Sequence, residues 1–111
     1  MLRGVSPSII RKNLDTMISS LKARDIDVLL AGMVAAPNLG ASFAGEFNAI
    51  FPDLADQHDV PLIPFVLDGV ATDRGLLLED GMHPNAEGVS RMVEVALPAV
   101  EAAMKGALAS R

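Results

Sequence analysis

Residues 76–92 read "LLLEDGMHPNAEGVSRM", an apolar run followed by an acidic pair, a turn and the start of an amphipathic pattern. Asp80 and His83 lie three apart across Gly81, whose missing Cβ permits backbone angles that a β-branched residue resists. Pro84 restricts the residue before it to an extended conformation. Such a turn can bring a carboxylate against an imidazole, which is how the histidine of a Ser-His-Asp triad is oriented.

Patterns on the N-terminal side of this stretch predict an α/β fold. Residues 27–33 ("DVLLAGM") form a continuous apolar run, typical of a parallel strand covered on both faces. Residues 60–66 ("VPLIPFV") predict a second strand at a sheet edge, because Pro61 and Pro64 cannot donate ladder hydrogen bonds. Helices are predicted at residues 6–25, at 42–58 and from 85 onward. Helix, strand, helix, strand, helix is the order of right-handed crossovers on a parallel sheet.

Caps and apolar faces define the three predicted helices. Ser6 and Asn85 are suitable N-caps, and Pro7 suits a first helical position. Pro52 predicts a kink or break in the second helix, and Pro98 a bend in the third. The predicted apolar faces are Ile10, Leu14, Met17, Ile18 and Leu21 in the first helix, Phe43, Phe47, Ile50, Phe51 and Leu54 in the second, and Val89, Met92, Val93, Ala96, Val100, Ala103 and Met104 in the third.

Composition limits the classes of function. A chain of 111 residues holds at most one domain with a modest core. The net charge of −5, with four Phe and no Tyr or Trp, leaves neither a basic surface for phosphates nor aromatic platforms for bases, so nucleic acid is not an expected partner. No run of apolar residues has the length of a membrane span. The absence of cysteine excludes disulfides and thiolate chemistry but identifies no compartment.

Two parallel strands make a poor sheet. The first strand is apolar on both faces, so its unpaired edge predicts further strands. These would come from another chain, from a second copy or from residues before this sequence.

Two other interpretations of the 76–92 stretch stay open on the residues alone. Asp80 can be an ordinary turn residue and His83 a solvated loop residue ahead of a helix that starts at Asn85. Asp80, His83 and Glu87 can also be ligands of a hard or borderline cation, although no second histidine completes the set.

The longer string "DGMHPNAEG", preceded by "VPLIPF" and "GMVAAPNLG", resembles the C-terminal portion of the SGNH (GDSL-type) hydrolases, in particular their arylesterase and acyl-CoA thioesterase/lysophospholipase branch. The family's last block, D-x-x-H-P, matches Asp80, His83 and Pro84. The resemblance implies a flavodoxin-like three-layer α/β/α sandwich, with residues 1–111 as a partial domain holding two strands and about three helices. It also implies ester or thioester hydrolysis without metal or cofactor, with His83 as general base and acid and Asp80 as its orienting carboxylate.

The same resemblance places the nucleophile outside this sequence. The family's G-D-S block, the glycine of its second block and its G-x-N-D block do not occur here, and Leu2–Gly4 look like the segment that follows the last of these. None of the seven serines lies in a strand-to-helix nucleophile turn. We therefore expect the isolated chain to be nearly inert, since one oxyanion donor alone is worth roughly 10²–10³ in turnover, and we expect a partner that carries the serine.

Residues 32–42 ("GMVAAPNLGAS") match a loop that borders the acyl or aryl pocket in the resembling enzymes. Met33, Pro37, Asn38 and Leu39 are therefore the candidate substrate-binding residues, and a simple turn between strand and helix is an equal alternative. His58 is expected to interact with a helix C-terminal dipole instead of substrate.

Overall fold

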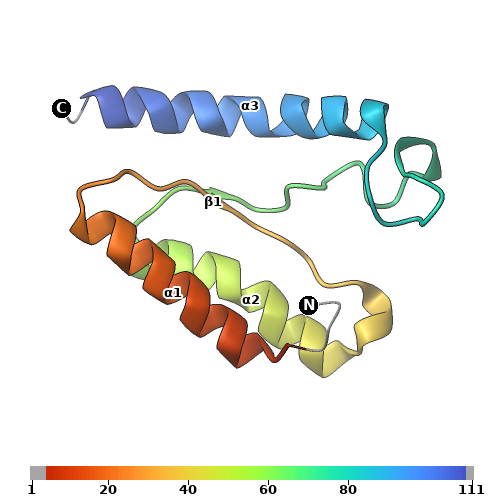
Figure 1. Cartoon of the computed structure of the whole chain (residues 1–111), viewed down its shortest axis with the longest axis horizontal. Coiled ribbons are helices and arrows are strands. Elements are labelled where there is room, and N and C mark those ends of the chain that lie inside the picture. Colours follow the sequence, from red (N-terminus) through yellow and green to blue (C-terminus); the bar gives the residue numbers. More distant parts are fainter. Residues whose placement is uncertain (1–4, 110–111) are drawn as a thin grey trace. The chain divides into compact units, whose positions relative to one another are not determined.

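The computed structural model describes residues 5–109, so Leu2–Gly4 and Ser110 lie outside the described residues. The elements follow in the order α1 (Pro7–Ala23), β1 (Leu30–Ala31), η1 (Pro37–Leu39), α2 (Ala41–His58), β2 (Leu62–Ile63), η2 (Arg74–Leu76) and α3 (Ala86–Ala109) (Figure 1). The predicted α/β class and the predicted order of helices and strands are confirmed. The chain divides into two compact units, Met1–Pro64 and Phe65–Arg111.

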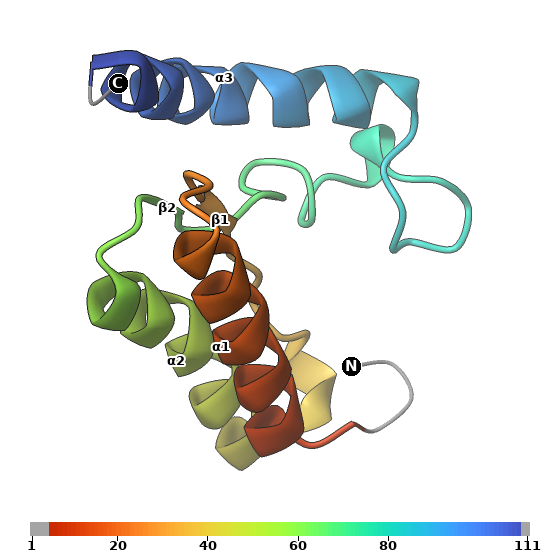
Figure 2. The same ribbon diagram turned by 60° about the vertical axis from the view of Figure 1, so that its left-hand side comes forward.

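Helices α1 and α2 lie side by side in the first unit (Figures 1 and 2). The predicted start of α1 is confirmed, because the Ser6 hydroxyl accepts the N–H of Ile9 and Pro7 occupies the first turn. Helix α2 continues through Pro52, so the predicted break does not occur.

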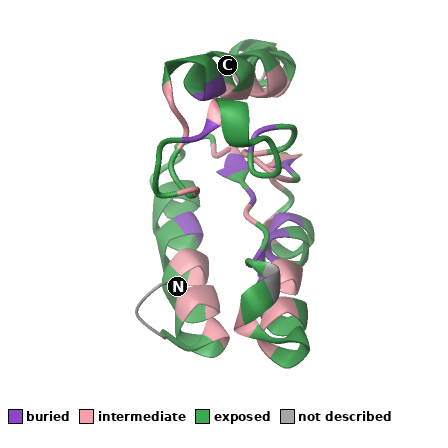
Figure 3. Cartoon of the chain, turned by 90° about the vertical axis from the view of Figure 1, so that its right-hand side faces the viewer, coloured by how far each residue is buried: buried purple, intermediate pink, exposed green. Residues whose placement is uncertain are grey.

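The core of the first unit forms between α2, α1 and the sheet. Its buried members are Ile18, Leu30, Ala35, Phe47, Ile50, Phe51, Leu54 and Ala55, shown among the purple positions of Figure 3. Phe47 stacks on Phe43 with ring centroids 5.9 Å apart and meets the ring of Phe51 edge-on at 5.5 Å. Of the phenylalanines on the predicted apolar face, Phe47 and Phe51 are thus buried in the core and Phe43 packs against it partly buried.

Two positions of the predicted α1 face are exposed, Met17 and, at 37%, Leu21. Met17 is 57% exposed, although Ile18 beside it is buried. Consecutive helical residues lie about 100° apart around the axis. Ile18, together with Ile10 and Leu14, packs against the core, which leaves Met17 toward solvent.

Strands β1 and β2 pair in parallel, with Leu30 opposite Leu62 and Ala31 opposite Ile63 (Figure 2). Both strands are much shorter than the predicted ranges 27–33 and 60–66. Pro61 precedes β2 with its carbonyl bonded to the Leu30 N–H, so its backbone faces β1, and it lacks the N–H that would extend the ladder on this side. The backbone nitrogen of Pro64 faces the other edge of β2, where it cannot donate to a further strand. Sheet length is thus limited by the partner strand and not by the apolar character of residues 27–33.

Glycine is required where β1 ends. The N–H of Gly32 donates to the carbonyl of Ile63 at 2.7 Å. A Cβ on Gly32 would lie 2.4 Å from the carbonyl oxygen of Pro64, so no larger residue fits this close approach of two backbones.

The second unit contains η2 and α3. Asn85 caps α3 as predicted, since its side-chain oxygen accepts the N–H of Gly88 at 2.9 Å. The predicted apolar face of α3 is largely uncovered, because Val89, Val93 and Met104 are at least half exposed. No helix within residues 5–109 combines the length and apolar character needed to cross a membrane.

Candidate active site

A short antiparallel hairpin in the second unit carries the predicted catalytic pair. Its arms are residues 76–78 and 83–85, and its tip is residues 79–82. Two backbone hydrogen bonds join the arms, from the Leu78 N–H to the His83 carbonyl at 2.7 Å and from the Asn85 N–H to the Leu76 carbonyl at 2.9 Å. The sequence predicted only a turn between Asp80 and His83, so the paired arms on either side are a finding of the structure.

Pro84 fits this hairpin without losing a hydrogen bond. It forms an isolated antiparallel bridge with Leu77. The two bonds of the bridge come from the residues that flank this pair, so neither Leu77 nor Pro84 has to donate its own N–H. The proline therefore fixes the backbone next to His83 at no cost to the pairing.

The side chain of Asp80 organises the hairpin tip. Its Oδ1 accepts the N–H groups of Met82 at 2.9 Å and of His83 at 3.0 Å. Gly81 adopts a φ of +68°, which favours glycine, and its N–H donates to the Leu78 carbonyl at 3.0 Å. These local bonds hold the carboxylate on the same side of the turn as the ring of His83.

The second carboxylate oxygen of Asp80 meets that ring. Oδ2 lies 2.5 Å from Nδ1 of His83. This hydrogen bond, followed by the two backbone N–H bonds to Oδ1, lowers the pKa of Asp80 to about 2. At neutral pH the carboxylate is therefore ionised and can only accept, so Nδ1 of His83 donates.

This pairing leaves Nε2 as the proton-accepting nitrogen of a neutral His83 ring. Within residues 5–109, no hydrogen bond is formed to Nε2. The His83 side chain is 65% exposed, so Nε2 can be approached by an incoming hydroxyl. The imidazole has the orientation that a general base needs, because the Asp80 carboxylate accepts from Nδ1 while Nε2 is accessible to a proton donor.

The cation-binding alternative is not supported by the geometry. Across residues 5–109, no group of three or more carboxylate, imidazole or thiol side chains is close enough to hold a metal ion. Glu87 lies in the first turn of α3 and does not join Asp80 and His83 as a third ligand.

The four candidate substrate-binding residues lie in the first unit, apart in the chain from the catalytic pair. Met33 and Leu39 are partly buried and pack against the core of that unit. Asn38 is exposed in η1, which begins at Pro37, whose side chain lies outside the described part of the chain. The structure does not test whether these residues line a pocket with Asp80 and His83, so that role stays a prediction.

Asn48 holds the loop that contains these residues. Its Oδ1 accepts the N–H of Ala35 at 2.7 Å, which ties the segment after β1 to α2. This contact could not be predicted, because Asn48 lies within a helical pattern and Ala35 in an apolar loop.

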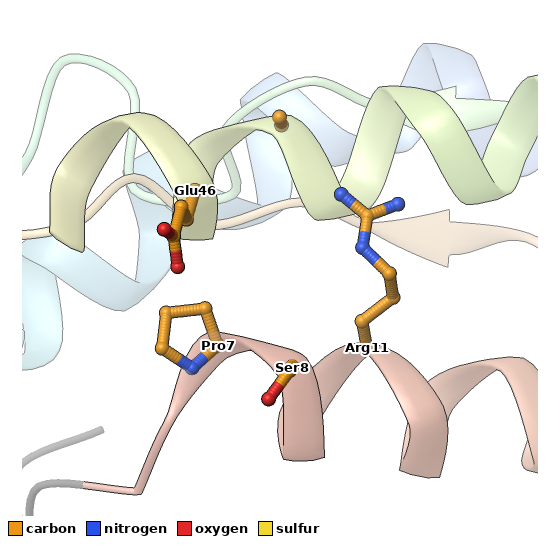
Figure 4. Close-up of a pocket in the computed structure, with 5 residues that line it drawn as sticks. Pro7, Ser8, Arg11 and Glu46 are labelled. Atoms are coloured by element: carbon orange, nitrogen blue, oxygen red, sulfur yellow. The ribbon is translucent and has the colours of Figure 1, made fainter. Parts of the chain in front are cut away.

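A surface pocket in the first unit is unrelated to the predicted site residues. It lies between the N-terminal halves of α1 and α2 and is lined by Pro7, Ser8, Arg11, Glu46 and Ala49 (Figure 4). Arg11 is already paired with Asp53 at 2.9 Å.

His58 has a different partner from the one expected. It is the last residue of α2, but its Nε2 lies 2.5 Å from Oδ1 of Asp15 in α1. Lys22 in the last turn of α1 bonds the His58 carbonyl. His58 therefore joins the two helices of the first unit.

Two residues that support the hairpin were missed or only partly predicted. Asn85 was predicted as a helix cap, but its Nδ2 also donates to the carbonyls of Gly75 at 2.9 Å and Leu77 at 3.4 Å. Gly88 was not predicted to matter, yet a Cβ there would lie 2.2 Å from the Leu76 carbonyl oxygen. The only feature of the sequence that points to Gly88 is its position, three residues after the N-cap Asn85 and inside an otherwise regular helical pattern.

Similar proteins agree with this fold. The arylesterase of Vibrio mimicus is 37% identical over 86 residues, covering 78% of this chain and 43% of its own length. The thioesterase 1/protease 1/lysophospholipase L1 of Escherichia coli K12 is 34% identical over 86 residues, covering 78% of this chain and 41% of its own. The crystal structure of TesA superimposes with a TM-score of 0.85 at 31% identity, over 92% of this chain and 57% of that one.

The chain thus spans less than half the length of these two curated relatives. A family model for GDSL-like lipases and acylhydrolases matches residues 1–91, which include both Asp80 and His83. On this match, the chain belongs to the GDSL-like lipase/acylhydrolase family.

Proposed function

We propose that this chain supplies the base and the orienting acid of a serine hydrolase that acts on carboxylic esters or thioesters. The observation that carries the proposal is the contact of Asp80 with Nδ1 of His83, which leaves Nε2 open at the tip of the hairpin. Its relatives named arylesterase and thioesterase/lysophospholipase support the ester and thioester substrate class.

His83 moves two protons in the proposed reaction. Nε2 takes the serine proton as the serine oxygen attacks the acyl carbon, and it then gives that proton to the leaving alkoxide or thiolate. Water enters, loses a proton to Nε2 and attacks the acyl-enzyme, and the serine recovers a proton as the acid leaves. Asp80 stays ionised and stabilises the imidazolium that forms in each half of the cycle.

The serine and the oxyanion donors are proposed to come from a polypeptide outside these 111 residues. The sequence has no G-D-S or G-x-N-D block, and the serines of α1, α2 and α3 lie at caps or inside helices. The complementary part carries the blocks that this family places before D-x-x-H-P.

The test is hydrolysis of a p-nitrophenyl ester by this chain, alone and mixed with a polypeptide carrying the G-D-S block. We expect negligible turnover by the chain alone and clear turnover by the mixture. In the mixture, His83→Ala should abolish most of the rate, and Asp80→Asn should reduce kcat by roughly 10⁴-fold. His58→Gln is the matched control, because His58 is the other histidine of the chain and contacts Asp15. Full turnover with His83→Ala would remove His83 from the mechanism.

A second candidate function is a non-catalytic assembly module that completes its sheet with another chain. The observation that favours it is the sheet itself, in which β1 is paired along one edge only within residues 5–109. Sedimentation of the isolated chain tests this candidate. A stable, folded monomer whose sedimentation does not change when the G-D-S polypeptide is added would contradict both proposals, the association with that polypeptide and the completion of the sheet by another chain.

A further inference from the structure

The base of the hairpin is closed by one side chain. The carboxamide of Asn85 has two functional ends, and each end is bonded to a different element. Its Oδ1 accepts the N–H of Gly88 in α3 at 2.9 Å. Its Nδ2 donates to the carbonyl of Gly75 at 2.9 Å and, more weakly, to that of Leu77 at 3.4 Å. The backbone N–H of Asn85 adds a third link, to the Leu76 carbonyl at 2.9 Å.

These bonds converge where the chain enters and leaves the hairpin. Gly75 belongs to η2, which precedes the first arm, and Leu77 lies on that arm opposite Pro84. Asn85 ends the second arm and caps α3. One residue therefore connects η2, both arms and the helix, and His83 lies only two positions away from it.

The position of His83 depends on this closure. Its carbonyl accepts the N–H of Leu78 across the arms, and its own N–H donates to Asp80. If the arms separate, the tip can open and the contact between the carboxylate and Nδ1 is no longer enforced. Both side chains of the pair are substantially exposed, at 44% for Asp80 and 65% for His83, so surrounding side chains do little to hold them.

We propose that Asn85 is a positioning residue for Asp80 and His83, with its Nδ2 amide closing the hairpin and its Oδ1 oxygen separately capping α3. The effect on turnover rests on the proposed function. The effect on the geometry of the pair does not.

The Asn85→Ser substitution separates the two roles. Asn85→Ser keeps a side-chain oxygen for the helix cap but removes the Nδ2 donor, without changing the charge. Asn85→Ala removes both roles. Ser6→Ala is the matched control, because it removes the α1 cap in the other unit and leaves the hairpin intact.

The measurement is the pKa of the Asp80 carboxyl by ¹³C NMR on the full chain, with helix content by circular dichroism. In Asn85→Ser we expect the Asp80 pKa to rise from about 2 toward 3.8 while helix content stays at the wild-type level. Asn85→Ala should give the same rise together with loss of helix stability, and Ser6→Ala should leave the Asp80 pKa at about 2.

An Asp80 pKa that stays at about 2 in Asn85→Ser would overturn the proposal, as would an equal rise in Ser6→Ala. In the mixture with the G-D-S polypeptide, Asn85→Ser should lower kcat and leave KM unchanged. If the mixture has no activity at all while the pKa rises as expected, the proposed function fails and the positioning role stands.

Discussion

At the scale of single residues, the charge of Asp80 is set mainly by one neighbour. The hydrogen bond from the His83 ring is the largest cause that lowers its pKa to about 2, ahead of the two backbone N–H bonds. His83→Ala removes only the first of these. We therefore expect an Asp80 pKa between about 2 and 3.8 in this variant, measured by ¹³C NMR titration. A pKa that stays at about 2 would show that the backbone alone holds the carboxylate.

The same shift gives stability a pH dependence with a defined sign. The folded-state pKa of Asp80 lies below its ordinary value of 3.8, so the stabilisation is fully present above pH 3.8 and is lost as pH falls to about 2. His83→Ala should flatten the part of the stability profile that falls within this window. Urea unfolding of both proteins over this pH range measures the difference, and parallel profiles would contradict it.

Gly88 is a position in α3 at which a single added carbon would collide with backbone. Its Cβ would lie 2.2 Å from the Leu76 carbonyl oxygen and 3.0 Å from Cβ of Pro84. Backbone must move to admit it, so Gly88→Ala should destabilise the chain by about 1–3 kcal/mol, as overpacked sites do. Gly106→Ala in the same helix is the control, because nothing lies within 4 Å of its Cβ position. That change should stabilise by about 1 kcal/mol, and urea denaturation distinguishes the two signs.

At the scale of elements, the helices could be predicted from the sequence because their signals are local. Ser6 and Asn85 cap α1 and α3 within three residues of themselves. The lengths of the strands could not be predicted in this way, since the ladder of β1 depends on Pro61, some thirty positions further along the chain. The hairpin was missed because its arms are short and one contains a proline, which is a signal against a strand.

The contact of α1 with α2 should be stabilised by its buried apolar residues and hardly at all by its ion pair. Ile50 is fully buried in the core between these elements, so Ile50→Ala should cost about 2–5 kcal/mol. Asp53→Ala breaks the bond to Arg11, but both side chains are partly exposed, so we expect a loss of about 0–1 kcal/mol. Thermal or urea unfolding compares the two, and similar losses would mean that the ion pair is stronger than its exposure implies.

At the scale of the whole molecule, the candidate catalytic pair was visible in the sequence because Asp80 and His83 share one turn. The complementary residues were not, since a serine hydrolase site is assembled from segments far apart in the chain. Met33, Pro37, Asn38 and Leu39 lie in the first unit and the pair in the second, so no local pattern could relate them. The structure shows the Asp80–His83 contact, and the pocket role of the four residues is a prediction from the family resemblance alone.

The exposed face of α3 gives the last prediction, which concerns association with the G-D-S polypeptide. Val93 and Leu97 lie four residues apart on one face of α3 and are 57% and 48% exposed. Neighbouring exposed apolar side chains of this kind are typical of a surface that binds another polypeptide. Covering a leucine contributes about 1.5–3 kcal/mol, so Leu97→Lys should weaken the association by roughly 10- to 100-fold.

The matched control is Ala102→Lys, which adds the same charge about 140° around the helix from Leu97. Ala102 is exposed, so this change should leave both folding and association unaltered. Sedimentation of the mixture measures the dissociation constants, and circular dichroism confirms that both variants keep their helices. Equal weakening by both variants would show that charge, and not this apolar face, controls the association. No weakening by Leu97→Lys would place the interface elsewhere on the chain.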